Sequence, residues 1–338
     1  MLLSNRNTLI LDSAQLSRRK KMNAMQRLNR IVKEKGPLIA GLDPDFDKIK
    51  QVWITQNEEL VADGKLEGDP EKNRTIMGTF CQDYIEAVKE SVGVIKINSA
   101  FFEAMQMEDL YWNIAMNAQM EGLYVIGDLK RADIGNTSME YAKAYLDATS
   151  PFDAITVNPY FGTDGIKPFL DLAKKNDKGI FVLAKTSNQS SAEIQDLELK
   201  DGRKVYEAVA DKIKEWGDYT NPRREKYSLV GAVVGATHSE QAKELRKRMP
   251  NTFFLVPGYG KQGATANDVA VNFDKKGGGA AINSSRGIMF AYKSDIWKEQ
   301  YSEEFWNEAA AAEANRAQTE LKRARIKYKQ KHCILRAI

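Results

Sequence analysis

The sequence predicts an α/β protein built as a single (β/α)₈ TIM barrel with N- and C-terminal extensions. Short apolar runs of strand character recur along the chain, and helix-period stretches separate them. The runs are continuous rather than alternating, as in strands buried on both faces. Alternation of strand and helix implies a parallel sheet, and eight units over roughly 250 residues favour a closed barrel over a doubly wound sheet. The predicted strands are 37–43, 92–98, 123–130, 154–160, 179–187, 229–237, 252–259 and 279–285.

Helical periodicity and charge define the remaining elements. Helix-period stretches occur at 101–120, 137–148, 203–217, 239–249 and 296–330. The last of these has a basic end and too few apolar heptad positions for a coiled coil. The chain of 338 residues therefore divides into an extension at 1–21 that we expect to be flexible, a barrel at 22–300, and a C-terminal helix and basic tail at 301–338.

Composition excludes several classes of protein. Hydrophobic residues make up 43% of the chain and charged residues 28%, which indicates a sizeable core rather than disorder. A net charge of +4, from 50 basic and 46 acidic residues, is too balanced to indicate a nucleic-acid or membrane partner. No run approaches the ~18 apolar residues of a spanning helix. Residues 1–21 have the opposite polarity to a signal peptide, so we expect a cytoplasmic protein.

The chain has only two cysteines and two histidines. Cys81 lies in a helical pattern and Cys333 in the basic tail with His332, so a disulfide or a Cys-rich metal site is not expected. His238 follows a strand-like run, where a place at the start of a helix is the simpler interpretation. A histidine metal site and a Ser-His-Asp triad are therefore disfavoured. Acid–base chemistry in this chain must rest on Lys, Asp, Glu or Tyr.

Polar residues interrupt the apolar runs where the predicted strands end, which is where barrel enzymes place their catalytic groups. Lys96, Asp128 and Lys130 are each embedded in apolar strand sequence. Because an unpaired buried charge is costly, these groups should meet one another. A purely structural ion-pair network is the alternative, and a functional cluster is favoured over it. The other strand-end residues are Asp43, Asn98, Asn158, Lys185, Ser187, Asn188, Gln262, Ser285 and Arg286.

The segment GDLKRADIGNTS carries the clearest chemical pattern. Asp128 and Lys130 are two residues apart and so lie on one side of a strand, and Asp133 follows in the loop. We expect the two carboxylates to surround Lys130 and keep it protonated. Such a lysine is a proton donor or a cation for a developing negative charge. A Schiff-base aldolase, which requires a lysine of lowered pKa, is a minor alternative.

Two polar loops predict a phosphate site. VPGYGKQGA follows the seventh predicted strand and NSSRGI the eighth, and barrels of this class often bind phosphate at those two loops. The Gln262 amide and the Arg286 guanidinium are suitable donors to phosphate oxygens.

Taken together, these motifs resemble the orotidine 5'-phosphate decarboxylase family, specifically its longer bacterial subfamily (type 2). DLKRADIGNT matches the family's D-x-K-x-x-D signature. GLDPD, TVNPYFGTDG, AKTSNQSSAEIQDL, VVGAT, VPGYGKQGA and NSSRGI are similar to that subfamily's strand-end motifs and occur in the same order. The resemblance covers about residues 36–292.

The resemblance implies decarboxylation of orotidine 5'-phosphate to UMP without metal or cofactor, the last step of de novo pyrimidine nucleotide synthesis. It implies that Lys130 stabilises and then protonates a carbanion at C6 of the pyrimidine. Asp128 would orient Lys130 and face the substrate carboxylate. Lys96 and Asp43 would contact the ribose, with Lys96 completing an alternating array of charges.

The resemblance also implies a homodimer with shared active sites. Asp133 and Thr137 would complete the partner subunit's site, and Ile134 between them is counted among the substrate-binding residues. Ser187 would meet the pyrimidine amide, while Gln262 and Arg286 would hold the 5'-phosphate.

Two alternatives stay open. A metal-dependent sugar-phosphate lyase or decarboxylase of the same superfamily shares the D-x-K-x-x-D pattern, but it typically carries a Glu ligand where this chain has Lys96, and a cation cannot bind Mg²⁺. A non-catalytic barrel with an RNA-binding basic tail is a remote alternative, because it leaves the charges at the strand ends unexplained.

Overall fold

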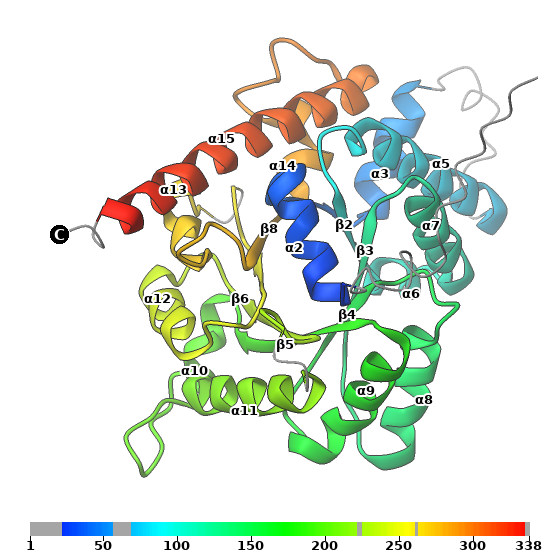
Figure 1. The fold of residues 1–338 in the computed structure, drawn as a ribbon. Coiled ribbons are helices and arrows are strands. Elements are labelled where there is room, and N and C mark those ends of the chain that lie inside the picture. The colour runs from blue at the N-terminus through cyan, green and yellow to red at the C-terminus, as the bar shows by residue number, and fades with distance from the viewer. Residues whose placement is uncertain (1–21, 57–68, 222–224, 261–262, 335–338) are drawn as a thin grey trace, which may run out of the picture.

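The computed structural model describes residues 22–56, 69–221, 225–260 and 263–334. Eight parallel strands close into a barrel in sequence order, from β1 round to β8, which pairs with β1 (Figure 1). The predicted barrel and all of its strands are confirmed, although most strands end earlier than the apolar runs do. The strands are β1 (Leu38–Leu42), β2 (Val94–Asn98), β3 (Tyr124–Arg131), β4 (Ala154–Val157), β5 (Gly179–Lys185), β6 (Val230–Val234), β7 (Phe254–Pro257) and β8 (Ala280–Ser284).

Helices surround the barrel because each strand is followed by a crossover that must cover the outer face of the sheet. The main helices of this layer are α3 (Phe46–Gln56), α5 (Pro70–Val88), α7 (Glu108–Met120), α8 (Gly135–Leu146), α9 (Gly162–Asn176), α11 (Val205–Thr220) and α12 (Ser239–Arg248). The stretch 101–120 does not form one helix. It is broken into α6 (Ala100–Glu103) and α7 by a turn in which Gln106 has a φ of 54°.

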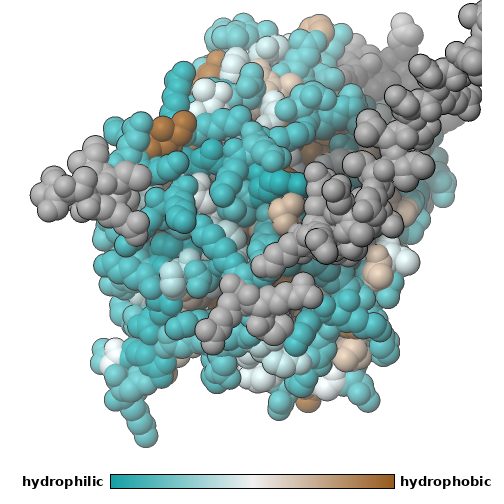
Figure 2. All heavy atoms as spheres, viewed as in Figure 1, coloured by the Kyte–Doolittle hydropathy of each residue, from teal (hydrophilic) through white to brown (hydrophobic). Residues whose placement is uncertain are grey.

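Helix α2 (Ala24–Glu34) closes the end of the barrel from which the strands start. A capping box between Asn23 and Gln26 fixes its first turn. Met25, Leu28 and Val32 on one face are fully buried, in a cluster with barrel side chains that include Phe181. In Figure 1 this helix crosses the middle of the barrel, and Figure 2 shows that the same face of the molecule is mostly hydrophilic.

The C-terminal helix α15 (Trp306–Ile334) packs against the barrel, where it contacts α5, α14 and β1. Trp306 is 1% exposed and stacks on Phe80 of α5 with ring centroids 4.1 Å apart. The Gln318 side chain accepts a hydrogen bond of 3.0 Å from the backbone N–H of Leu38 in β1. The predicted C-terminal helix is present, although it begins at Trp306 and not at 296. The predicted extension at 1–21 lies outside the described residues. None of the helices that the structure describes is long and apolar enough to cross a membrane.

Candidate active site

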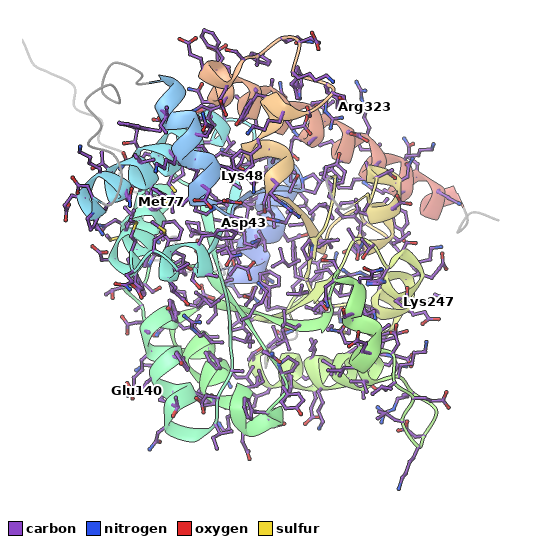
Figure 3. All side chains as sticks on the ribbon, turned by 180° about the vertical axis from the view of Figure 1, so that it is seen from behind. Asp43, Lys48, Met77, Glu140, Lys247 and Arg323 are labelled. Carbon is purple, nitrogen blue, oxygen red and sulfur yellow. The ribbon has the colours of Figure 1, made fainter. Side chains whose placement is uncertain are left out.

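A cavity of ≈ 400 Å³ opens at the end of the barrel where the strands finish, opposite α2. In Figure 3, which views the molecule from behind, Asp43 lies near the middle of this end. Six of the predicted site residues line the cavity, although they come from five different strand ends. They are Asp43, Lys96, Asp128, Lys130, Ser187 and Arg286.

Four charged side chains form a row in which the charges alternate. The Lys96 ammonium lies 2.6 Å from Oδ2 of Asp128 and 3.5 Å from Oδ1 of Asp43. The Lys130 ammonium lies 2.6 Å from the other carboxylate oxygen of Asp128, Oδ1. The order is therefore Asp43, Lys96, Asp128, Lys130. The predicted meeting of the strand-end charges does occur.

Burial sets the electrostatics of this row. Lys96 is 4% exposed and Asp128 is 8% exposed. Burial alone would lower the pKa of Lys96, but the charges of Asp128 and Asp43 outweigh it and raise that pKa above its ordinary value. Burial alone would raise the pKa of Asp128, but Lys96 and Lys130 outweigh it and hold that pKa well below its ordinary value. Both groups are therefore charged at neutral pH.

The prediction that two carboxylates surround Lys130 is wrong within one chain. Among the residues that the structure describes, Lys130 makes an ion pair with Asp128, whereas Lys96 is the lysine that lies between two carboxylates. The Asp133 carboxylate instead accepts the backbone N–H of Ile134 at 2.8 Å. Asp133 sits beyond the end of β3, where the loop turns away from the cavity into α8. Spacing in the sequence does not reveal that turn.

Thr156 on β4 fixes the backbone that carries Lys130. Its hydroxyl oxygen accepts the N–H groups of Leu129 and Lys130 at 2.9 and 3.0 Å, and the hydroxyl donates to Oδ1 of Asp128 at 2.9 Å. The register between β3 and β4 shifts between Gly127 and Arg131. The backbone of Lys130 has a φ of 50°, a value that residues other than glycine rarely adopt. Strain of this kind is often retained at functional sites.

Arg286 begins the short helix α14 (Arg286–Met289), with one residue between it and the end of β8, and lines the cavity. Ser285 beside it accepts a hydrogen bond of 3.1 Å from the buried Asn283 amide. Gly41 of β1 lies so close to Ser285 that a Cβ atom there would overlap the Ser285 hydroxyl. Gln262, the other predicted phosphate residue, lies outside the described residues.

The loop after β5 carries Ser187, and hydrogen bonds from the end of β5 hold it in place. The fully buried Lys185 donates to Asp196 at 2.8 Å, and the backbone N–H of Thr186 donates to the Gln195 side chain at 2.9 Å. These bonds draw the far end of the loop back to the strand, so that Ser187 and its neighbours face the cavity.

Ile134 and Thr137 do not line the cavity of their own chain. Ile134 is 57% exposed and precedes α8, and Thr137 is exposed on the first turn of that helix. With Asp133, they form a surface at the edge of the barrel mouth. Their predicted role toward a partner subunit stays a prediction.

Two buried polar strand residues of the cavity, Thr156 and Asn283, are not among the predicted strand-end residues. Both interrupt apolar strand runs, in AITVNPY and GAAINSS, and that signal was available in the sequence. Thr156 is 1% exposed and Asn283 5%. A threonine is common in strands, so its type alone does not indicate a site.

Within the described part of the chain, no three His, Cys, Asp or Glu residues come together as a metal site.

Comparison with known proteins gives a consistent result. The model of the orotidine 5'-phosphate decarboxylase / HUMPS family matches residues 69–295. The chain is 40% identical over 296 residues to the orotidine 5'-phosphate decarboxylase of Caldicellulosiruptor bescii, an alignment that covers 83% of this chain and 95% of the relative. It is 41% identical over 251 residues to that of Rhodopirellula baltica, covering 72% and 82% of the two chains. The structure of Leishmania donovani OMP decarboxylase superposes with a TM-score of 0.65 and 29% identity, over 90% of this chain and 99% of that one.

Proposed function

This chain belongs to the orotidine 5'-phosphate decarboxylase / HUMPS family and decarboxylates orotidine 5'-phosphate to UMP, and we propose that the row Asp43, Lys96, Asp128, Lys130 performs the chemistry. The single observation that carries the proposal is the buried Asp128 carboxylate held between two ammonium groups. A cavity of ≈ 400 Å³ falls within the range of about 300–1,000 Å³ that small-molecule sites occupy.

Loss of CO₂ leaves an electron pair at C6 in the plane of the pyrimidine ring, where the π-system stabilises it little. The enzyme must therefore provide a fixed positive charge at that point. Lys130 is proposed to do so and then to transfer a proton from its ammonium to C6. Because Lys130 is bonded to Asp128, its direction is set before the substrate arrives.

Asp128 is proposed to face the carboxylate that leaves. Its negative charge repels the carboxylate of the bound substrate but hardly repels the neutral product CO₂. Loss of CO₂ therefore relieves the repulsion, which favours the reaction. Lys96 has a different role: it keeps the buried Asp128 ionised and, with Asp43, is proposed to bind the ribose hydroxyls.

The remaining contacts place the substrate. Arg286, with its fork of N–H donors, and Gln262 are proposed to bind the 5'-phosphate. Ser187 is proposed to bind the pyrimidine amide. Binding energy from the phosphate, which takes no part in bond breaking, then helps to hold C6 at Lys130.

A homodimer is part of the proposal, with Asp133, Ile134 and Thr137 completing the partner subunit's site. Apolar side chains support an interface there: Ile134 is 57% exposed, Tyr160 82% and Phe161 50%. The two loops adjoin each other, because Gly165 lies against both the Asp133 carbonyl and the Phe161 side chain. Exposed apolar groups that gather beside a site commonly mark contact surfaces.

The test is to mix the purified chain with orotidine 5'-phosphate and follow the loss of the substrate's ultraviolet absorbance, before and after exhaustive treatment with EDTA. We expect turnover in both cases, because Asp43 and Asp128 are already paired with Lys96 and are poorly placed to bind a divalent cation. Turnover that EDTA abolishes and Mg²⁺ restores would instead favour the metal-dependent sugar-phosphate chemistry.

A further inference from the structure

A second hollow, of ≈ 930 Å³, lies between α12, the turn before β8 and the end of α15. We call it the α12–α15 groove. The segments that carry it lie together at one edge of the barrel (Figure 1). Lys247 marks this edge in Figure 3, far from Asp43 at the mouth. Lys226 precedes β6 and Lys275 precedes β8, whereas the active-site residues follow their strands, so the groove belongs to the other end of the barrel.

Lysines from separate elements line this groove, and most have no acidic partner. Lys243 pairs with Glu240, and Lys226 pairs with Asp274. No ion pair links any of the others to an acidic group in the part of the chain that the structure describes. Like charges brought together repel, so a cluster of this kind is suited to a multiply charged anion. The unpaired lysines are Lys247, Lys275, Lys276 and Lys331.

The acidic residue of the groove, Asp274, is already saturated. One carboxylate oxygen accepts from Lys226 and from the Tyr227 hydroxyl, and the other accepts the backbone N–H groups of Lys276 and Gly278 at 2.8 and 2.9 Å. Asp274 therefore has no capacity left to neutralise the free lysines.

Arg246 adds a cation at the floor of the groove. It is 8% exposed, and its guanidinium donates to backbone carbonyl oxygens, including those of Thr252 at 2.7 Å and Gly279 at 2.7 Å. These carbonyl partners carry no net charge, and the charge that acts on Arg246 from the groove is that of the Asp274 carboxylate, which is already paired with Lys226.

The surface between the lysines is apolar. Pro250, Val271 and Tyr328 contribute to it, with Tyr328 half-buried so that one part of the residue faces the groove. Apolar surface with a few charged groups at its rim is the usual lining of a small-molecule site. Aromatic and aliphatic side chains of this kind accept a flat ring, while the rim binds phosphate.

We propose that the α12–α15 groove binds a nucleoside triphosphate, with the phosphates on Lys247, Lys275, Lys276 and Lys331 and the base on the apolar surface between the lysines. The lysines line one hollow, which favours a compact anion over a nucleic-acid strand. The groove adjoins no part of the barrel mouth, so its ligand is a bound effector and not a second substrate.

The experiment measures UTP binding by titration calorimetry on the full chain carrying Arg286→Ala, which removes the phosphate donor at the mouth. Two further variants are made in this background. The groove pair combines Lys247→Glu with Lys275→Glu. The matched control pair combines Lys214→Glu with Lys298→Glu, which change exposed lysines of α11 and of the segment before α15. We expect the groove pair to weaken UTP binding by about tenfold or more and the matched pair to leave it unchanged. With native Arg286, the groove pair should turn over orotidine 5'-phosphate like the unaltered chain, which also verifies folding.

Three further ligands test the chemistry of the site. Uridine should bind much more weakly than UTP, and inorganic tripolyphosphate should bind more weakly than UTP because it lacks the ring. The proposal is overturned if the Arg286→Ala chain binds no UTP, or if both lysine pairs weaken binding equally. Tripolyphosphate binding as tightly as UTP, or a short single-stranded RNA binding more tightly, would overturn it as well.

Discussion

The Lys130 ammonium lies 2.6 Å from Oδ1 of Asp128, yet the two side chains differ greatly in exposure: 50% for Lys130 and 10% for Asp128. Lys130 thus reaches from the edge of the cavity to a buried carboxylate. That carboxylate has a second cation, Lys96, at 2.6 Å. The consequence is that Lys130 is needed for chemistry much more than for stability.

Lys130→Ala should therefore reduce kcat by several orders of magnitude while the free energy of unfolding changes little. The proton donor and the charge beside C6 are lost, but Asp128 keeps its ion pair with Lys96. Turnover of orotidine 5'-phosphate and thermal unfolding measure the two effects. Lys48→Ala is the control, since Lys48 is 48% exposed and pairs with Asp45 just after β1. Near-normal decarboxylation by Lys130→Ala would contradict the mechanism.

Thr156→Val should lower both activity and stability. The change keeps the shape of the side chain but leaves the N–H groups of Leu129 and Lys130 without their acceptor, which costs about 1–3 kcal/mol of unfolding free energy. Because the backbone of Lys130 is then less well fixed, kcat should fall by about tenfold or more.

The control for Thr156 is Thr220→Val, which removes another buried hydroxyl, one that donates to the Gly217 carbonyl on α11. Denaturant unfolding and steady-state kinetics distinguish the two variants. Thr220→Val should lose stability and keep its kcat. If Thr156→Val loses only stability as well, Thr156 does not position Lys130.

Arg286→Ala should weaken binding of UMP far more than binding of uridine. A bidentate phosphate contact acts only when the phosphate is present. Calorimetry with both ligands measures the difference. Arg286→Lys keeps the charge but not the fork of donors, so its affinity for UMP should lie between those of the unaltered chain and Arg286→Ala. Equal losses for UMP and uridine would mean that the phosphate binds elsewhere.

A mixture of two inactive chains tests the shared site. Lys130→Ala and Asp133→Ala chains, mixed in equal amounts and allowed to exchange subunits, should recover about a quarter of normal activity. Random exchange makes about half of the dimers mixed, and each mixed dimer has one complete site of its two. Mass measurements verify the exchange. An inactive mixture after verified exchange would show that Asp133 acts within its own chain.

The sequence by itself determined the fold and most of the residues at the mouth. Continuous apolar runs separated by helical stretches leave few arrangements other than a parallel barrel, and a parallel barrel brings all strand ends to one place. That is why the sequence predicts Asp43, Lys96, Asp128, Lys130 and Arg286 at the mouth, where the structure has them. Buried charges within apolar strands are conspicuous, because each one requires a partner.

Only the tertiary structure decided which of these charges pair. D-x-K-x-x-D suggested two carboxylates around Lys130, but the chain turns after β3 and carries Asp133 away, while β1 brings Asp43 to Lys96. The hydrogen bonds of Thr156 and the α12–α15 groove could not be predicted for the same reason: contacts between neighbouring strands, or between helices far apart in the sequence, create them. Sequence patterns report the period and burial of each element, whereas contacts between elements depend on register and on the path of the loops.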